Sequence, residues 1–213
     1  IYTHLYIDSK AKLEVGGTEV EITQKTNYPW DGKVVINLNL DEAKEFGLAV
    51  RIPGWCRESR LKLNGQEIDL ASITVDGYAV VQRLWKDGDR LELDLRMEPV
   101  RVRSNPKVKA NVGKVAIQQG PIVYCLEEAD NGPELHSLIL PKDAALKSSF
   151  REDMLGGINV ITAEGQRIKE DAWGPELYRA EVSIEYEPAK LTFIPYYAWA
   201  NRQIGEMTVW VRE

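Results

Sequence analysis

At 213 residues, the chain is long enough for one large β domain or two ordinary ones, and its core needs no disulfides. The formal net charge of −6 argues against a nucleic-acid partner, which would require a basic face to displace counterions from phosphates. No apolar run reaches the roughly 18 residues of a membrane-spanning helix, so we expect no membrane partner.

The first residues already form a β-rich pattern, without a preceding cap or turn. We therefore expect the chain to come from inside a longer protein. Alternation of apolar and polar residues predicts strands with one wet face in segments 33–40, 90–98 and 206–213. Their apolar members are Val34, Ile36, Leu38 and Leu40, then Leu91, Leu93, Leu95 and Met97, and finally Met207, Val209 and Val211.

Turn signals separate the strand-like runs, and each includes a residue that tolerates positive φ, as two-residue hairpins need. They are Gly16-Gly17, Asp31-Gly32, Asn64-Gly65, Asp76-Gly77 and Asp87-Gly88. Short strands with regular turns predict an all-β fold of two antiparallel β-sandwich domains, jelly-roll-like in form.

Prolines and polar residues interrupt the strand pattern in "EPVRVRSNPKVKAN", residues 98–111, and predict a domain boundary there. We place the first domain at 1–103 and the second at 104–202, each of about a hundred residues. The stretch 127–157 has little strand character and is long for a sandwich connection. Such a loop is either functional or covers an open end of a domain, and the sequence does not decide between the two.

The sequence offers little for a metal or catalytic site. His4 and His136 are the only histidines, and neither has a second histidine three to five residues away, as zinc motifs do. We expect Cys56 and Cys125, which lie far apart, to be buried free thiols. Cys125 would face the same side of a strand as Glu127, which gives one pair of ligands and not a site. We therefore assign no catalytic residue and no metal ligand.

Aromatic residues carry the remaining signal. An exposed ring can stack on a sugar whose hydroxyls bond neighbouring amide or guanidinium groups. The candidate carbohydrate contacts are Trp30 in "NYPWDG" and Tyr196, Tyr197 and Trp199 in "IPYYAWANR". Rings at strand ends more often fill a core or a domain junction. We favour the junction for "IPYYAWANR", because it lies just before the last predicted strand.

Six segments, taken in order, resemble the C-terminal region of glycoside hydrolase family 127, the β-L-arabinofuranosidase family. They are "IYTHLYIDS", "LAVRIPGWC", "LKLNG", "WKDGDRLELDLRMEPVRV", "GKVAIQQGPIVYCLEE" and "FIPYYAWANRQIGEMTVWVR". The resemblance covers nearly the whole chain and is weakest from Asp130 to Tyr178. Its most specific pieces are "GPIVYCLE" and "PYYAWANR".

The resemblance implies that catalysis belongs to a part of the parent protein upstream of this chain. Members of the family carry an (α/α)6 barrel that cleaves a terminal arabinofuranose with retention, using a zinc-bound cysteine thiolate and a glutamate. Cys56 and Cys125 do not match the family's cysteine motif, so zinc is expected in the barrel and no cofactor in this chain. A bacterial cytoplasmic location is expected from the family alone.

The resemblance also implies that the second sandwich is an insertion and that the final strand, 203–213, returns to complete the first sandwich. The stretch "IPYYAWANR" would then be the crossing between them, with Pro195 and its aromatic neighbours filling the seam.

The first functional hypothesis is an accessory, non-catalytic region that supports the catalytic barrel of a β-L-arabinofuranosidase-like glycoside hydrolase. One alternative is a carbohydrate-binding module for arabinose-containing glycans. Another is a structural or dimerisation domain pair that forms a homodimer.

Overall fold

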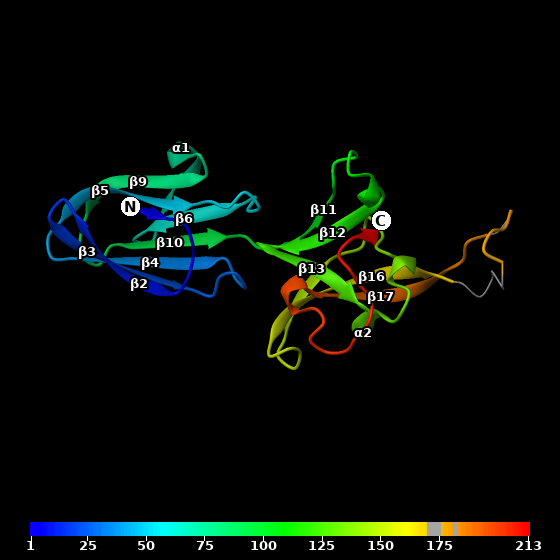
Figure 1. Cartoon of the computed structure of the whole chain (residues 1–213). Helices are drawn as coiled ribbons and strands as arrows, with labels where there is room; N and C mark the ends of the chain where they lie inside the picture. Colours follow the sequence, from blue (N-terminus) through cyan, green and yellow to red (C-terminus); the bar gives the residue numbers. More distant parts are fainter. Residues whose placement is uncertain (170–175, 181–182) are drawn as a thin grey trace. The chain divides into compact units, whose positions relative to one another are not determined.

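The computed structural model describes residues 1–169, 176–180 and 183–213 and divides into two units, Ile1–Met97 and Glu98–Glu213 (Figure 1). Strands predominate in both units, which confirms the predicted all-β class. The division falls before the boundary expected at residue 103, because β11 (Pro99–Val102) pairs with β12 (Lys114–Gln119) of the second unit. The proline-containing stretch 98–111 therefore opens the second unit.

The first unit consists of two sheets. A four-stranded sheet has the order β1-β5-β9-β8, and a six-stranded sheet has the order β2-β3-β4-β10-β6-β7. The short helix α1 (Leu70–Ile73) precedes β8. The strand bounds are β1 (Tyr2–Thr3), β2 (Ser9–Val15), β3 (Thr18–Thr26), β4 (Lys33–Leu40), β5 (Lys44–Arg51), β6 (Ser59–Leu63), β7 (Gln66–Ile68), β8 (Thr74–Val75), β9 (Tyr78–Trp85) and β10 (Arg90–Leu95).

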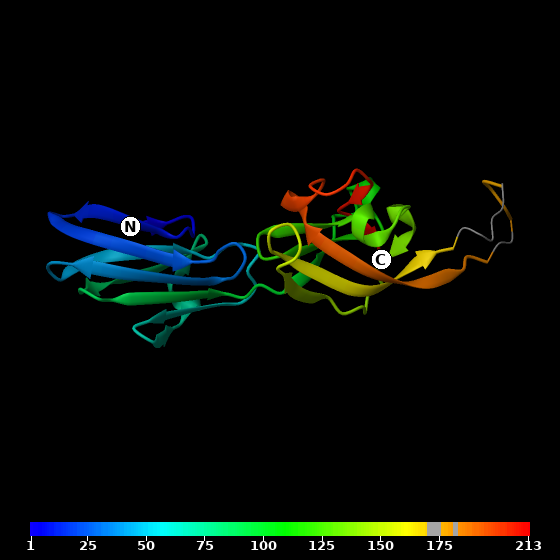
Figure 2. The same ribbon diagram turned by 90° about the horizontal axis from the view of Figure 1, so that it is seen from below.

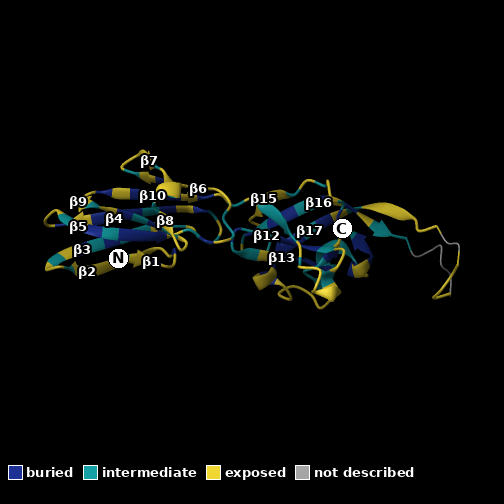
Figure 3. Ribbon diagram, turned by 90° about the horizontal axis from the view of Figure 1, so that it is seen from above, coloured by how far each residue is buried: buried dark blue, intermediate teal, exposed yellow. Residues whose placement is uncertain are grey.

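Alternation along the strands supplies one apolar core to both sheets of the first unit. Figure 3 shows the buried positions of these strands in dark blue. The predicted inward residues of β4 are all buried: Val34, Ile36, Leu38 and Leu40. They share the core with Leu48 of β5 and Trp85 of β9, which come from the other sheet. Removing each such side chain from water contributes about 1.5–3 kcal/mol, so this cluster is the main source of the unit's stability.

Three of the predicted hairpin turns are observed, and two turn signals have other roles. Asn64-Gly65 joins β6 to β7 with φ values of 51° and 80°. Asp87-Gly88 links β9 to β10, which belong to different sheets, so it is not a hairpin. Gly32 is required by a close approach and not by positive φ, because a Cβ there would lie 1.8 Å from the carbonyl oxygen of Leu95. Gly16-Gly17 and Asp76-Gly77 form the other two hairpins.

Among the described residues of the second unit, nine strands pair into one sheet. The pairings run through β12, β19, β14, β16, β17 and β13, and β13 pairs with β12 again, so these strands close into a ring. Figure 2 shows the long β16 and β17 ribbons, in yellow and orange, side by side. The remaining strand bounds are β13 (Ile122–Glu127), β14 (Leu138–Ile139), β15 (Lys147–Arg151), β16 (Ile158–Ile168), β17 (Tyr186–Pro195), β18 (Met207–Thr208) and β19 (Val211–Arg212).

The stretch 127–157, predicted to be a long loop, contains regular structure. It holds the strands β14 and β15 and two short helices, α2 (Glu128–Asn131) and η2 (Leu135–Ser137). Two further helical turns of the second unit are η1 (Lys109–Asn111) and η3 (Tyr196–Ala198). The helix α2 continues directly from β13, which places its polar side chains beside the end of that strand.

The final strands correct the predicted topology. Strand β18 pairs with β13, and β19 pairs with β12 and β14, so segment 203–213 completes the second unit and not the first. The reason is packing, because Val211 is only 2% exposed and belongs to the second unit's own core cluster. Pro195 pairs with Tyr124 of β13, so "IPYYAWANR" stays within the second unit and is not a crossing.

Candidate functional site

The aromatic segment that follows β17, residues 196–199, has exposed rings in the second unit, whereas the sequence favoured a buried junction for it. The exposed fractions are 44% for Tyr196, 55% for Tyr197 and 39% for Trp199. The cause is the single turn of η3, in which Ala198 is the buried residue. The rings of Tyr196 and Trp199 lie 6.3 Å apart between centroids and are tilted by 30°. Three of the four candidate carbohydrate contacts therefore share one short segment.

Trp30, the fourth candidate, belongs to the first unit. It is 53% exposed and lies in the connection between β3 and β4. The structure therefore brings Tyr196, Tyr197 and Trp199 together in the second unit, and Trp30 is not part of that group.

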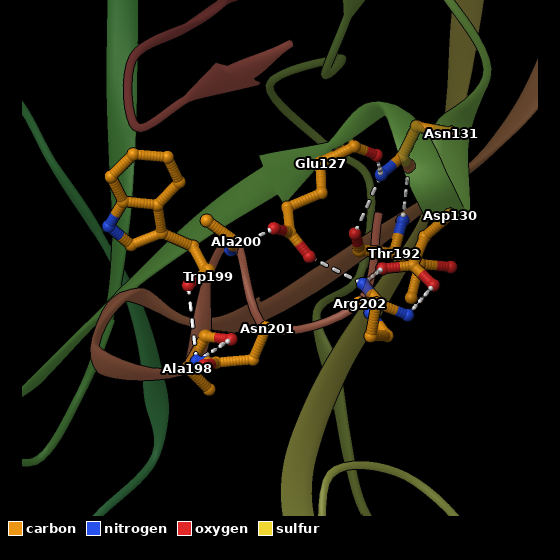
Figure 4. A network of polar contacts seen from close by, with 9 residues as sticks. All are labelled: Glu127, Asp130, Asn131, Thr192, Ala198, Trp199, Ala200, Asn201 and Arg202. Carbon is orange, nitrogen blue, oxygen red and sulfur yellow. Dashed lines mark hydrogen bonds and ion pairs between the residues drawn. The ribbon is translucent and has the colours of Figure 1, made fainter. Parts of the chain in front are cut away.

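A group of charged residues holds the chain directly after Trp199, as Figure 4 shows. Glu127, at the end of β13, accepts hydrogen bonds from the backbone N–H of Ala200 and from Nη2 of Arg202, both at 2.6 Å. Arg202 Nη1 also donates to Asp130 Oδ1 at 2.7 Å, and Nη2 contacts the other carboxylate oxygen. The side chains of Glu127 and Asp130 are only 7% and 10% exposed. Buried carboxylates require such partners, so one arginine satisfies both.

This arrangement braces the backbone and offers no free acid or base. Hydrogen bonds from Arg202 to Asp130, and secondarily to Glu127, raise the pKa of Arg202 above its ordinary value, so its charge is permanent. Ala200 has a left-handed φ of 60°, which costs about 1–2 kcal/mol for a residue with a Cβ. Its bond to Glu127 offsets part of that cost and holds the segment in one conformation.

Asn131 fixes the helix α2 to the neighbouring strand β17. Its Nδ2 donates to the carbonyl oxygens of Glu127 and Thr192, at 2.8 and 3.0 Å. Its Oδ1 accepts from the N–H of Thr192 at 2.8 Å. Further along, Asn201 Nδ2 donates to the carbonyl oxygens of Ala198 and Trp199. Both amides therefore serve the local backbone.

A small hollow of about 120 Å³ lies beside Trp199. Its lining includes Glu128, Gln203 and Glu206. Glu128 Oε2 accepts from the N–H of Glu206, which ties this wall to the end of β13. The volume is below the roughly 300 Å³ at which small-molecule pockets usually begin, so the hollow suits part of one sugar ring.

Neither cysteine fits the role of a zinc-bound or activated thiolate. Cys125 lies in an apolar cluster with Ile158, Val160 and Ile194, and burial raises its pKa to about 12. Cys56 is half-buried, its thiol donates to the carbonyl oxygen of Glu58 at 3.0 Å, and burial likewise raises its pKa. Both thiols are protonated at neutral pH, whereas nucleophiles and metal ligands require the thiolate.

The described ranges contain no grouping of three His, Cys, Asp or Glu side chains that could hold a metal ion. Glu127, the partner considered for Cys125, is occupied by Ala200 and Arg202. The residues present therefore do not fit zinc. Within the same ranges, no helix combines the length and apolar character needed to cross a bilayer.

Sequence reasoning missed the brace formed by Glu127, Asp130 and Arg202. Glu127 was considered only as a possible ligand beside Cys125, and Arg202 appeared only as the last residue of "IPYYAWANR". The two residues are 75 positions apart in the chain, so no local pattern connects them. The two residues lie in the stretches "YCLEEAD" and "YAWANR", and nothing in the sequence indicates that these stretches come together in the fold.

Two family models match consecutive parts of the chain. Residues 1–97 match the model described as "Beta-L-arabinofuranosidase, GH127 middle domain", and residues 99–212 match the "Glycoside hydrolase family 127 C-terminal domain". The two matches meet where the structure divides into its two units.

Individual relatives are considerably longer than this chain. The non-reducing end β-L-arabinofuranosidase of Bifidobacterium longum subsp. longum is 38% identical over the whole chain, which spans 33% of that protein. The crystal structure of a GH127 β-L-arabinofuranosidase from Geobacillus stearothermophilus T6 matches with a TM-score of 0.97 and 47% identity, over 100% of this chain and 33% of that one. A second GH127 β-arabinofuranosidase structure matches with a TM-score of 0.87 and 34% identity, over 99% of this chain and 34% of that one.

Proposed function

Because the chain belongs to glycoside hydrolase family 127, we propose that it is an accessory, non-catalytic region of a β-L-arabinofuranosidase. The observation that carries the proposal is the extent of the match. The chain spans about a third of the relatives named above, and the matched models are the family's middle and C-terminal domains. Its partner would be a catalytic barrel in the same protein, which the two β units would support.

The chemistry of the two thiols supports the same proposal. A zinc-bound thiolate would supply the nucleophile that the family resemblance implies. In this chain, Cys125 is enclosed by aliphatic side chains and Cys56 donates to a backbone carbonyl. We therefore propose that zinc and the nucleophile are held by residues outside these two units.

Activity of the purified chain tests the proposal directly. We expect no hydrolysis of an aryl β-L-arabinofuranoside, with or without added zinc, while a full-length β-L-arabinofuranosidase assayed in parallel is active. Hydrolysis by the chain that is abolished in the Cys125→Ala or Cys56→Ala variant would overturn the proposal, because it would place a nucleophile in these units.

A second candidate function is the binding of arabinose-containing glycans at the aromatic segment. The observation that favours it is the exposure of Tyr196, Tyr197 and Trp199 on a segment held rigid by the bonds of Glu127. Stacking of a sugar on a preorganised ring costs little conformational entropy. The adjacent hollow, with Glu128 and Gln203 in its lining, offers partners for hydroxyl groups.

Tryptophan fluorescence distinguishes this candidate from a purely structural role. We expect arabino-oligosaccharides to quench the fluorescence, and we expect Trp199→Ala to remove that quenching while the fold is retained. Trp30→Ala, in the other unit, is the matched control and should leave it unchanged. Absence of quenching, combined with self-association in sedimentation analysis, would instead favour the structural alternative, a homodimer.

A further inference from the structure

The second unit contains a larger hollow that neither the proposed function nor the aromatic segment uses. It has a volume of about 440 Å³, within the range of about 300–1,000 Å³ typical of small-molecule sites. Its lining includes Lys114, His136, Glu206, Trp210 and Arg212. Although the whole chain carries a net charge of −6, basic side chains outnumber acidic ones at this place.

Two of these basic residues face each other across a strand pair. Lys114 of β12 is the antiparallel partner of Arg212 of β19, and the adjacent pair, Val115 and Val211, is buried in the core. Because side chains alternate along a strand, Lys114 and Arg212 both point away from that core. Like charges directly opposite each other are destabilising, so a bound anion would stabilise this pair.

Within the described residues, neither Lys114 nor Arg212 has a side-chain ion pair or hydrogen bond. Glu213, next to Arg212, is 7% exposed and is bonded by Arg103, with Nε 3.0 Å from Oε2. Glu206, in the lining, accepts from the N–H of Leu135 at 2.8 Å. Glu213 is therefore engaged elsewhere, whereas Glu206 keeps its carboxylate in the hollow, where Lys114 and Arg212 outnumber it.

Two further features indicate a chain-like ligand. Trp210 lines the hollow and is half-buried, and an indole face suits the apolar side of a sugar ring. A second hollow of about 210 Å³ shares Lys114 and adds Lys142. Lys114 therefore lines both hollows. A cation in that position could contact two successive charged residues of one ligand chain.

We propose that this surface, defined by Lys114, Trp210 and Arg212, binds a carboxylate-bearing sugar residue of an acidic glycan. The guanidinium and ammonium groups hold the carboxylate of a uronic acid, and the indole supports its ring. The inference goes beyond the proposed function, because the site requires no catalysis and is built on Lys114, Trp210 and Arg212, although Glu206 also lines the hollow beside Trp199. It adds an anionic polysaccharide to the ligands of this chain.

The inference is tested by titrating the whole chain with trigalacturonic acid. Calorimetry measures the affinity, and the NMR signal of the Trp210 indole N–H reports binding at this surface. We expect binding that weakens about tenfold in Lys114→Gln and in Arg212→Gln, and that weakens as salt is added. Lys147→Gln makes the same charge change on exposed β15, outside both hollows, and should bind like the parent chain.

Three other probes identify the chemistry that is recognised. Neutral galactotriose, inorganic phosphate and a short single-stranded DNA should each bind at least about tenfold more weakly than trigalacturonic acid. Equal binding of galactotriose would overturn the role of the carboxylate. Equal binding of phosphate or DNA at the same residues would overturn the assignment to a glycan.

Thermal unfolding controls for damage to the fold, since Arg212 lies in β19. If Arg212→Gln fails to fold, Arg212→Lys keeps the charge and should retain binding within a few-fold of the parent chain. No binding by the parent chain, or no movement of the Trp210 indole signal, would overturn the inference. Trp199→Ala should leave this binding intact, which separates it from the candidate sugar surface of the aromatic segment.

Discussion

The two units each contain a buried carboxylate, and they satisfy it in different ways. In the first unit, Asp89 is 6% exposed and accepts from the N–H of Lys86 at 2.9 Å and from Asn64 Nδ2 at 2.7 Å. In the second unit, Glu127 takes its partners from Ala200 and Arg202, more than seventy residues along the chain.

The two buried carboxylates, Asp89 and Glu127, therefore have different structural roles. Asp89 closes its own turn through the N–H of Lys86, ties it to the β6–β7 turn through Asn64, and lies 3.5 Å from Nη2 of Arg83, all within the first unit. Glu127 holds a distant segment that carries the exposed aromatic residues. The first unit therefore depends mainly on its apolar core, whereas the second also depends on a charged brace for the shape of its surface.

The largest effect is expected from the first unit's core. Trp85→Ala should lower the free energy of unfolding by about 3–5 kcal/mol, because the side chain is fully buried and its indole N–H donates to the carbonyl oxygen of Phe46. Urea denaturation measures this loss. Trp85→Phe should lose less, and a loss below about 1 kcal/mol in the alanine variant would contradict the primacy of the apolar core.

Removal of the arginine of the brace comes next. Arg202→Met leaves Glu127 and Asp130 buried without their counter-charge, and we expect a loss of about 3 kcal/mol. Urea denaturation again measures it, and Arg151→Met, which breaks an exposed ion pair with Asp153, is the control that should leave stability unchanged. If the two variants are equally stable, the brace contributes nothing to the fold.

A smaller effect is expected at the carboxylate of the first unit. Asp89→Asn keeps the shape of the side chain but weakens its bonds to Lys86 and Asn64, so the loss should be about 1–2 kcal/mol. The same denaturation assay on Arg202→Met shows which of the two buried carboxylate groups contributes more to the free energy of unfolding. A greater loss for Asp89→Asn would reverse the contrast drawn between the units.

The smallest effect concerns pH. The pKa of Cys125 is raised by burial from its ordinary value of 9.0 to about 12, so in alkali the unfolded thiol ionises before the folded one. Stability is therefore full below pH 9 and falls as the pH rises toward 12. Between about pH 8 and about pH 9.5, linkage gives a loss of about 0.8 kcal/mol that is absent in Cys125→Ala. Equal slopes of unfolding free energy against pH would contradict it.

Part of the fold follows from local patterns. The alternation of Val34, Ile36, Leu38 and Leu40 predicted both strand and buried face, and Asn64-Gly65 predicted a hairpin. The partner of the last strand could not be predicted, because alternation specifies which face of Val211 is buried but not which sheet buries it. The resemblance to glycoside hydrolase family 127 is confirmed, whereas the predicted return of segment 203–213 to the first unit was wrong.

Less of the candidate site could be predicted. The aromatic residues were identified from their composition, but their exposure depends on one helical turn that directs Ala198 inward. The pairing of Glu127 with Arg202, and of Lys114 with Arg212, arises only when distant strands meet. Periodicity does not show which distant strands pair, which is why neither of these charged pairs was predicted from the sequence.

The position of β19 bears on how the protein is made. This strand lies between β12 and β14, and Val211 fills the core that they share. During synthesis on the ribosome, the first unit can fold once residue 97 has left the exit tunnel, since domains generally fold as units in order of their synthesis. The ring of the second unit must wait with its β12 and β14 edges unpaired until residues 211–212 emerge. For that interval Lys114 and Val115 of β12 and Ile139 of β14 lack their strand partners, so the ring stays open at this point.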